Sequence, residues 1–224
     1  MKKAFLKSAV LLVVIFAMYS CGAKSNEGNI ANKEENDSAL LSENKNVCEE
    51  YTKLKISNEE REKLNTFFSN FSEVYMEPFD EQSLTDTKMI DFAVSHNYIN
   101  NYKSFESSGD NTAKIKKEFI DKSAKKFFGR KITSHQSTEY IKYTNGYYYK
   151  EEASGGEYIF SEIEDLFEVS DYYYYAIVNI YIASSGWDGS LTGDDAPELY
   201  NQMGAYITKK ENKYVLNEYQ IFKN

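Results

Sequence analysis

Side chains that could support nucleophilic or metal-dependent catalysis are scarce in this chain. It contains two histidines, His96 and His135, and two cysteines, Cys21 and Cys48. A nucleophile needs an adjacent base. His96 falls inside a predicted buried helix, where a hydrogen-bonded interior histidine is the simpler interpretation, and His135 falls in a polar loop. Because these four residues also lack the spacing of a metal cluster, we expect no metal or other cofactor and favour a protein that is not an enzyme.

Carboxylates, in contrast, are plentiful, with 35 aspartates and glutamates in the sequence. Two carboxyl groups at a suitable separation can hydrolyse a glycosidic bond, and that separation depends on the fold. No spacing singles out a pair, and no catalytic motif is recognisable. A hydrolase that uses a carboxylate pair is therefore the alternative from the enzyme class.

The segment Ser184–Glu198 contains the only tryptophan, Trp187, directly before Asp188. An indole ring can stack on a sugar while the neighbouring carboxylate accepts hydrogen bonds from hydroxyl groups. Three aspartates of this loop, Asp188, Asp194 and Asp195, could also bind calcium, although their spacing is not that of an EF-hand. The competing interpretation is that Trp187 closes one end of the core and the aspartates solvate the turn.

The tryptophan loop follows the most strand-like run of the chain, Asp171–Trp187, which reads DYYYYAIVNIYIASSGW. Its period-two alternation of aromatic and β-branched residues predicts a long strand. One set of alternate side chains, from Tyr172 to Ile182, should face the core. The other set should face a partly solvated surface, so we add four of its members to Trp187 and Asp188 as candidate binding residues: Tyr173, Tyr175, Asn179 and Tyr181.

The N-terminus predicts export. Met1–Ser20 has lysines at its start, a short apolar run, and small Ser20 directly before Cys21. This block resembles a bacterial lipoprotein signal, and the resemblance implies that Cys21 becomes the mature N-terminus and carries lipid. It also implies a lipid-anchored protein of the cell envelope that faces the extracytoplasmic side. An ordinary cleaved signal is the alternative.

Residues 21–55 should form a disordered tether, because they are rich in Asn, Glu, Lys and Ser and too poor in apolar residues to form a core. Cys48 lies in this stretch. The whole chain has a net charge of -9, and removal of three signal lysines brings the mature chain near -12. A surface this acidic repels nucleic acid, which we exclude as a partner. The expected partners are the membrane, through the lipid, and a glycan or envelope protein; the oligomeric state stays open.

Three helices should come first in the folded part. Ser57 and Glu60 match a capping box that opens an amphipathic helix ending near Glu77. A second helix is expected from residue 86 or 87 to about Tyr102, apolar on most sides and therefore buried. A third should span Thr112–Phe128 and close at Gly129. The polar side of this helix, together with Arg130 and Lys131 just after it, carries eight lysines and arginines and only two acids, Glu118 and Asp121. This side is either a solvated basic face or an anion-binding patch.

Strands should fill the rest of the chain. A hairpin over Ser137–Lys150 turns at Asn145-Gly146, since a type I′ turn needs two residues with positive φ. The other expected strands are 157–169, which we expect to be bulged, the long strand, 205–210 and 214–222. Helices followed by antiparallel strands predict an α+β fold. We expect one domain, 56–224, with three helices packed on a curved antiparallel sheet of five to six strands, which by topology resembles the cystatin/NTF2-like folds.

Three function hypotheses follow from these features. The leading one is a non-catalytic, lipid-anchored envelope protein that binds a glycan, a small ligand or a protein partner through its sheet face or tryptophan loop. The second is a hydrolase of envelope polymers that uses a carboxylate pair. The third is a structural or inhibitory partner protein. The fold resemblance does not discriminate among these hypotheses, because such folds host many functions.

Overall fold

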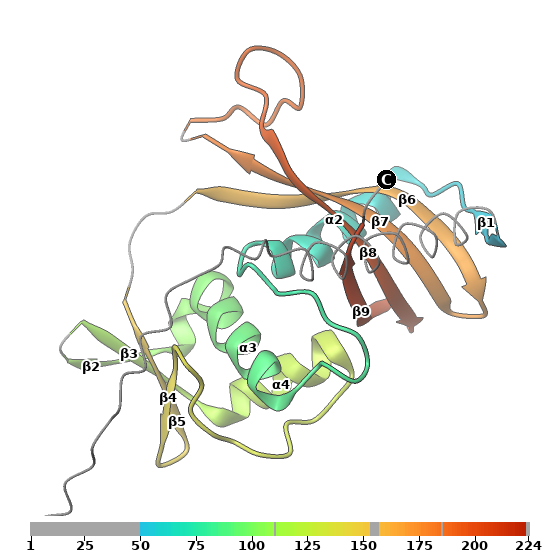
Figure 1. The fold of residues 1–224 in the computed structure, drawn as a ribbon. Helices are drawn as coiled ribbons and strands as arrows, with labels where there is room; N and C mark the ends of the chain where they lie inside the picture. The colour runs from blue at the N-terminus through green and yellow to red at the C-terminus, as the bar shows by residue number, and fades with distance from the viewer. Residues whose placement is uncertain (1–49, 110, 153–156, 185, 223–224) are drawn as a thin grey trace, which may run out of the picture.

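The computed structural model describes residues 50–109, 111–152, 157–184 and 186–222 of the 224-residue chain. These residues form three α-helices and two antiparallel sheets, so the predicted α+β class is confirmed (Figure 1). The predicted signal and most of the predicted tether, with Cys21 and Cys48, lie outside the described residues. Within the described ranges, no helix has both the length and the apolar character needed to cross a membrane.

Helix α2 (Asn58–Ser72) starts where the capping box predicts. The Ser57 hydroxyl oxygen accepts a hydrogen bond from the Glu60 N–H at 3.2 Å. The helix is shorter than expected because Tyr75 takes a left-handed conformation, with φ of 53°. The Met76 N–H then bonds back to the carbonyl of Phe71 at 3.0 Å, which is the hydrogen bond of a Schellman C-cap. Helix α3 (Asp86–Asn100) is followed by the short 3₁₀ helix η1 (Tyr102–Ser104).

The third helix is where the sequence-based expectation of the helices is wrong. Residues Thr112–Lys116 form strand β3, and only Lys117–Phe128 form helix α4, which closes at Gly129 with φ of 65°. Strand β3 pairs with the predicted hairpin, in the register that sets Ile115 opposite Tyr148. Pairing buries Ala113 and Ile115, two residues apart on one face of the strand, and this tertiary contact outweighs the local helical pattern.

The larger sheet has five strands in the order β1-β6-β7-β8-β9, all antiparallel. The expected bulge in the strand after residue 157 is present, as a register shift between Ile163 and Asp165. The strand that we expected at 205–210 is longer, because β8 already begins at Glu198, the last residue of the predicted tryptophan loop. The strands of this sheet are β1 (Thr52–Lys53), β6 (Tyr158–Ser170), β7 (Tyr173–Ala183), β8 (Glu198–Lys210) and β9 (Lys213–Ile221).

A second, smaller sheet replaces part of the single curved sheet that we expected. Its order is β2-β3-β5-β4, so β3 lies between the β2 edge and the predicted hairpin. The hairpin has the predicted register, in which Tyr143 faces Tyr148, and positive φ at both Asn145 and Gly146. The other strands of this sheet are β2 (Glu106–Gly109), β4 (Lys142–Thr144) and β5 (Tyr147–Glu151).

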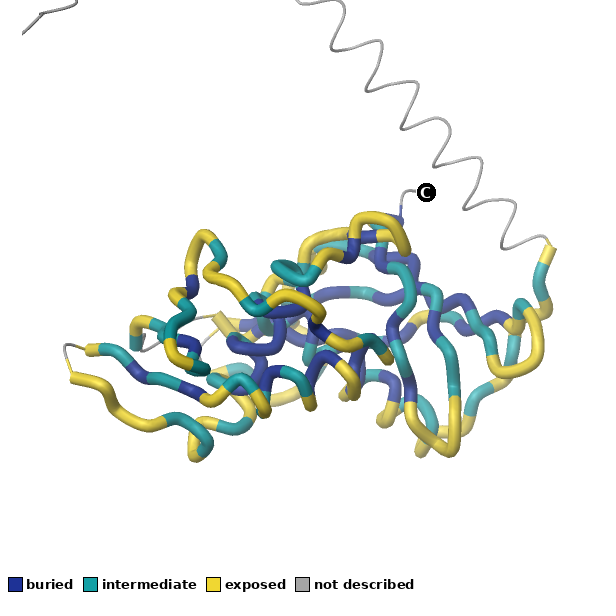
Figure 2. Tube along the Cα trace, turned by 90° about the horizontal axis from the view of Figure 1, so that it is seen from below, coloured by how far each residue is buried: buried dark blue, intermediate teal, exposed yellow. Residues whose placement is uncertain are grey.

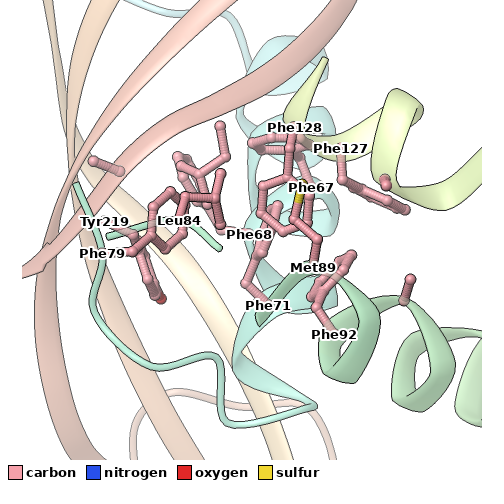
Figure 3. Close-up of a cluster of buried hydrophobic side chains, with 14 of the residues drawn as sticks. Phe67, Phe68, Phe71, Phe79, Leu84, Met89, Phe92, Phe127, Phe128 and Tyr219 are labelled. Carbon is pink, nitrogen blue, oxygen red and sulfur yellow. The ribbon is translucent and has the colours of Figure 1, made fainter. Parts of the chain in front are cut away.

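One main hydrophobic core joins the three helices and both sheets. The helices lie on one side of the larger sheet, and the smaller sheet lies beside α3 and α4 (Figure 1). Buried segments run continuously through the middle of the molecule, while turns and strand ends are exposed (Figure 2). The core is strongly aromatic where α2, α3 and α4 meet, and Phe71 contacts the rings of Phe92, Phe127 and Phe128 (Figure 3).

Other segments cap part of each side of the larger sheet, β1 and helix α2 on β6 and the Phe79 segment on β9, and this limits edge-to-edge association. Helix α2 covers the β6 edge: the Asn65 side chain accepts a hydrogen bond from the Ile163 N–H at 2.8 Å, and the Ser69 hydroxyl accepts one from the Ser161 N–H at 2.9 Å. On the β9 edge, Phe79 exchanges two backbone hydrogen bonds with Tyr219, at 2.7 and 2.8 Å.

The fold includes residues that precede the expected boundary at Ile56. Strand β1 pairs with Phe167 and Glu168 of β6, and Leu54 packs against the main core. Residues 52–54 therefore belong to the fold, because Leu54 and Ile56 supply apolar surface and Thr52–Lys53 supplies an edge pairing.

Candidate functional site

The predicted binding residues lie on one face of the larger sheet. We call this the outer face, since the three helices lie on the opposite side (Figure 1). The alternate residues Ala176, Val178 and Ile180 of β7 enter the main core on the helix side, as the sequence predicts. The remaining set therefore faces outward, and it includes four predicted residues: Tyr173, Tyr175, Asn179 and Tyr181.

An aromatic platform occupies one end of the outer face. The Trp187 indole stacks on the Phe160 ring, with centroids 4.6 Å apart and planes at 15°. Phe160 in turn stacks on Tyr181 at 5.4 Å, and Tyr158 flanks the row 5.8 Å from Trp187. Tyr158 is 58% exposed and Trp187 is half-buried. We use the name aromatic platform for these four residues.

Local hydrogen bonds hold the tryptophan loop in place. The indole N–H of Trp187 donates to the Ser190 carbonyl at 2.7 Å, and the Asp188 carboxylate accepts from the Ser190 N–H at 2.8 Å. Trp187 is therefore fixed on the platform rather than inserted into the main core. Among the described residues, no three His, Cys, Asp or Glu side chains converge as metal ligands, and Asp188, Asp194 and Asp195 are no exception.

Polar side chains continue the outer face beside the platform. The Gln202 amide nitrogen donates to the Asn179 side-chain oxygen at 2.7 Å and to the Glu164 carboxylate at 2.6 Å. This network crosses three strands, β6, β7 and β8. It places oxygen acceptors on the outer face, and Asn179 lies two residues along β7 from Tyr181 of the platform.

The other two predicted tyrosines lie at the far end of the outer face. Tyr173 stacks on Tyr206 with centroids 5.5 Å apart, and burial raises the pKa of Tyr173 to about 12. Tyr175 is only 3% exposed and packs with Phe167 in a separate small cluster. Eight residues along a strand span about 26 Å, so Tyr173 and Tyr181 lie at opposite ends of the outer face.

Tyr175 has its position because Gly204 lies beneath it. A Cβ atom at position 204 would lie 2.1 Å from the Tyr175 hydroxyl oxygen. The ring therefore crosses strand β8 at the one place where that strand has no side chain. Tyr175 is thus a packing residue of the outer face and is not accessible to a ligand.

Sequence reasoning missed Phe160, Tyr158, Gln202 and Glu164. One signal in the sequence could have identified the two aromatic residues: in the period-two pattern of this strand, Tyr158 and Phe160 fall on the opposite face from Ile163. By ordinary alternation along β6, Phe160 faces outward and opposite Tyr181, while Ile163 faces the core; the bulge comes only after Ile163. Gln202 lies on β8, and its place beside Asn179 could be predicted only if the pairing of β7 with β8 were known.

The two histidines occupy structural positions. His96 is 7% exposed, its ring stacks on Phe92 with centroids 5.6 Å apart, and burial, with a smaller contribution from Lys126, lowers its pKa to about 4. His135 bridges two elements, with ring nitrogens 2.7 Å from the Tyr148 hydroxyl and 3.3 Å from an Asp121 carboxylate oxygen. Since Tyr148 is fully buried, this arrangement presents no nucleophile to a substrate.

One cleft brings carboxyl groups together. It has a volume of about 670 Å³ between α3 and the segment before β4, and its lining includes Glu77, Asp91 and Glu139. Burial raises the pKa of Asp91, and the two glutamates act in the same direction, although Thr138 donates a hydrogen bond to its carboxylate. A carboxyl group with a raised pKa can act as a general acid.

Comparison with known proteins gives no relative. The chain matches no protein-family model, no curated protein and no solved structure. Evidence about function therefore comes from the residues and their geometry.

Proposed function

We propose that this chain is a non-catalytic, lipid-anchored protein of the cell envelope that binds a glycan on its aromatic platform. The observation that supports this most directly is the stacking of Trp187 on Phe160, on the sheet face that the helices leave uncovered. A tryptophan pinned in this way is pre-organised, so little side-chain entropy is lost when a ligand binds.

The chemistry of the neighbouring residues fits a sugar. The aromatic rings offer flat apolar surface to the C–H face of a pyranose ring. Glu164, Asn179 and Gln202 offer oxygen acceptors and an amide donor for hydroxyl groups. A neutral glycan suits this site better than a nucleic acid or an acidic polymer, because the chain carries a net charge of -9.

Attachment through Cys21 is part of the same proposal. A basic start, a short apolar run and a small residue before cysteine support it. Mass spectrometry of the mature protein should find a lipid-modified N-terminal Cys21. A mature N-terminus elsewhere, or an unmodified thiol at Cys21, would remove the anchor and leave the glycan site to be judged separately.

The binding test uses titration calorimetry to compare the Trp187→Ala variant with the parent chain. The ligands are soluble hexamers of N-acetylglucosamine and of glucose. We expect the variant to bind about tenfold more weakly, from the loss of one stacking contact, and Trp187→Phe to be intermediate. Tyr172→Asn is the matched control: Tyr172 is 67% exposed at the opposite end of the sheet, and its φ of 63° suits asparagine.

Two outcomes would contradict the glycan proposal. If Trp187→Ala lowers the thermal midpoint by as much as a core substitution, Trp187 is structural. If affinity is unchanged while the fold is retained, the platform does not bind these glycans.

The alternative functions predict different outcomes. Asp91 and its raised pKa favour the hydrolase as a second candidate. In that case the parent chain should produce new reducing ends in the hexamer solutions, and the Asp91→Asn variant should not. A partner protein without glycan affinity would instead be recovered by cross-linking of the anchored chain in its membrane, in a manner that depends on the platform.

A further inference from the structure

A groove on the helical side of the molecule gathers lysines from three elements. It has a volume of about 1140 Å³ and lies where α2, α4 and the β8–β9 turn meet. Its lysines come from all three: Lys63 from α2, Lys122, Lys125 and Lys126 from α4, and Lys210 and Lys213 from the β8–β9 turn. We call this feature the lysine groove. It is separate from the aromatic platform, which lies on the outer face.

Aromatic rings form the floor of the lysine groove. Phe67 of α2 lies 6.4 Å from the Phe127 ring of α4 and 5.7 Å from the Tyr214 ring of β9. Figure 3 shows Phe67 and Phe127 between these two helices. The three rings are contiguous and less than one-tenth exposed, and the hydrocarbon stems of the lysines extend the apolar walls above them.

Most ammonium groups at the rim have no ion pair among the described residues, although those of Lys122 and Lys126 lie over the rings of Phe119 and Phe127. Lys63 is the exception, with an ion pair to Glu59 at 2.7 Å. Within the described ranges, no carboxylate lies within 4.0 Å of the other five lysines: Lys122, Lys125, Lys126, Lys210 and Lys213. With Glu59, Glu62 and Glu211 as its acids, the groove has a balance of +3 in a chain of net charge -9.

Stabilisation of helix α4 does not explain this arrangement. Lys125 and Lys126 lie in the last turn of α4, where cations complement the helix dipole. Lys210 and Lys213 belong to a different element and have no such role, yet they line the same groove. Like charges brought together from separate elements repel one another, so an anion is the natural complement.

We infer that the lysine groove binds a single-chain anionic amphiphile, with its phosphate or carboxylate head at the lysine rim and its hydrocarbon chain on the aromatic floor. Charge complementarity selects the head, and the floor of Phe67, Phe127 and Tyr214 selects the chain. Neither part alone suffices: the rim lysines are exposed and screened by salt, and the floor offers no charge. The inference does not depend on glycan binding by the platform.

The test uses the full chain and probes below their aggregation concentration. Dodecyl phosphate and dodecanoate carry both parts of the ligand, dodecylphosphocholine has the same chain with a zwitterionic head, and butyl phosphate and inorganic phosphate keep the head. We expect calorimetry to detect the first two and to show at least about tenfold weaker binding for the others. The N-terminal apolar segment is the same in every comparison.

Variants locate the site. Lys122→Gln/Lys125→Gln/Lys126→Gln should weaken dodecyl phosphate binding about tenfold, and the corresponding arginine variant should restore it. The matched control, Lys55→Gln/Lys103→Gln/Lys142→Gln, removes the same charge from exposed residues outside the groove and should bind normally.

Three results would overturn the inference. Equal affinity for dodecyl phosphate and dodecylphosphocholine would show that charge is not selected. Equal loss in the two glutamine variants would show a general effect of charge. Lysine-dependent binding of a polyglutamate peptide, with no binding of dodecyl phosphate, would assign the groove to an acidic peptide instead.

Discussion

Tyr148 and Tyr219 show how much a single hydroxyl group depends on its partner. Both side chains are almost fully buried, at 0% and 1% exposure. The Tyr148 hydroxyl lies 2.7 Å from a ring nitrogen of His135. The Tyr219 hydroxyl has no hydrogen-bond partner among the described residues, and burial raises its pKa. An unpaired buried hydroxyl costs free energy that a phenylalanine would not.

Substitution of each tyrosine by phenylalanine should therefore change stability in opposite directions. We expect Tyr219→Phe to raise the free energy of unfolding by about 1 kcal/mol and Tyr148→Phe to lower it by about 1 kcal/mol. Urea titration of the two variants beside the parent chain measures both changes. If both substitutions destabilise the protein equally, the difference in pairing has no energetic consequence.

His96 makes stability depend on pH between its two pKa values. Burial lowers the pKa of His96 to about 4 in the fold, from an ordinary value of 6.5 in the unfolded chain. Above pH 6.5 the histidine is neutral in both states. As the pH falls through this window, only the unfolded chain takes up the proton, so the folded state loses stability, by about 2–3 kcal/mol at pH 4.5.

Substitution of His96 by phenylalanine isolates this contribution. Phenylalanine can stack on Phe92 in the same way but does not titrate. We expect the free energy of unfolding of the parent chain, relative to His96→Phe, to fall between pH 7 and pH 4.5, while the carboxylates affect both proteins alike. Urea titrations at several pH values would reveal the difference. Parallel curves would mean that His96 gains a proton freely in the fold.

At the scale of elements, local pattern predicted most boundaries well. The capping box at Ser57 and the Asn145-Gly146 turn each fix a backbone conformation with few neighbours involved, and both are present in the structure. The bulge in β6 could also be inferred, because it reverses the alternation of apolar residues within a single strand. These features depend on chemistry within a few residues of each other.

Residues Thr112–Lys116 show where local pattern fails. Ile115 fits the apolar stripe of a helix as well as the buried face of a strand. The outcome depends on β5, which lies more than thirty positions away in sequence and offers Tyr148 as a partner. The candidate site divides in the same way: Trp187 and Tyr181 were predicted from their own segment, whereas Phe160 joins them only through the pairing of β6 with β7.

At the scale of the whole molecule, the two sheets share one core. The main cluster of buried side chains includes Ile115 and Tyr148 of the smaller sheet together with Ile207 and Leu216 of the larger one. The helices connect them: α4 follows β3 directly in the chain and packs near β9. Local pattern predicted the strands β4 to β9 but missed β1, β2 and β3, and the division into two sheets depends on which edges the helices and the Phe79 segment occupy.

A shared core predicts that both sheets unfold in one cooperative transition. Ile115→Val and Ile207→Val form a matched pair, because both isoleucines have 0% exposure and lie in different sheets. Each should lower the free energy of unfolding by about 1 kcal/mol and shift the same single calorimetric peak. The calorimetric and van't Hoff enthalpies should agree in both variants. If Ile115→Val instead produces an early separate transition while Ile207→Val does not, the smaller sheet unfolds independently, and the helices do not couple the two layers.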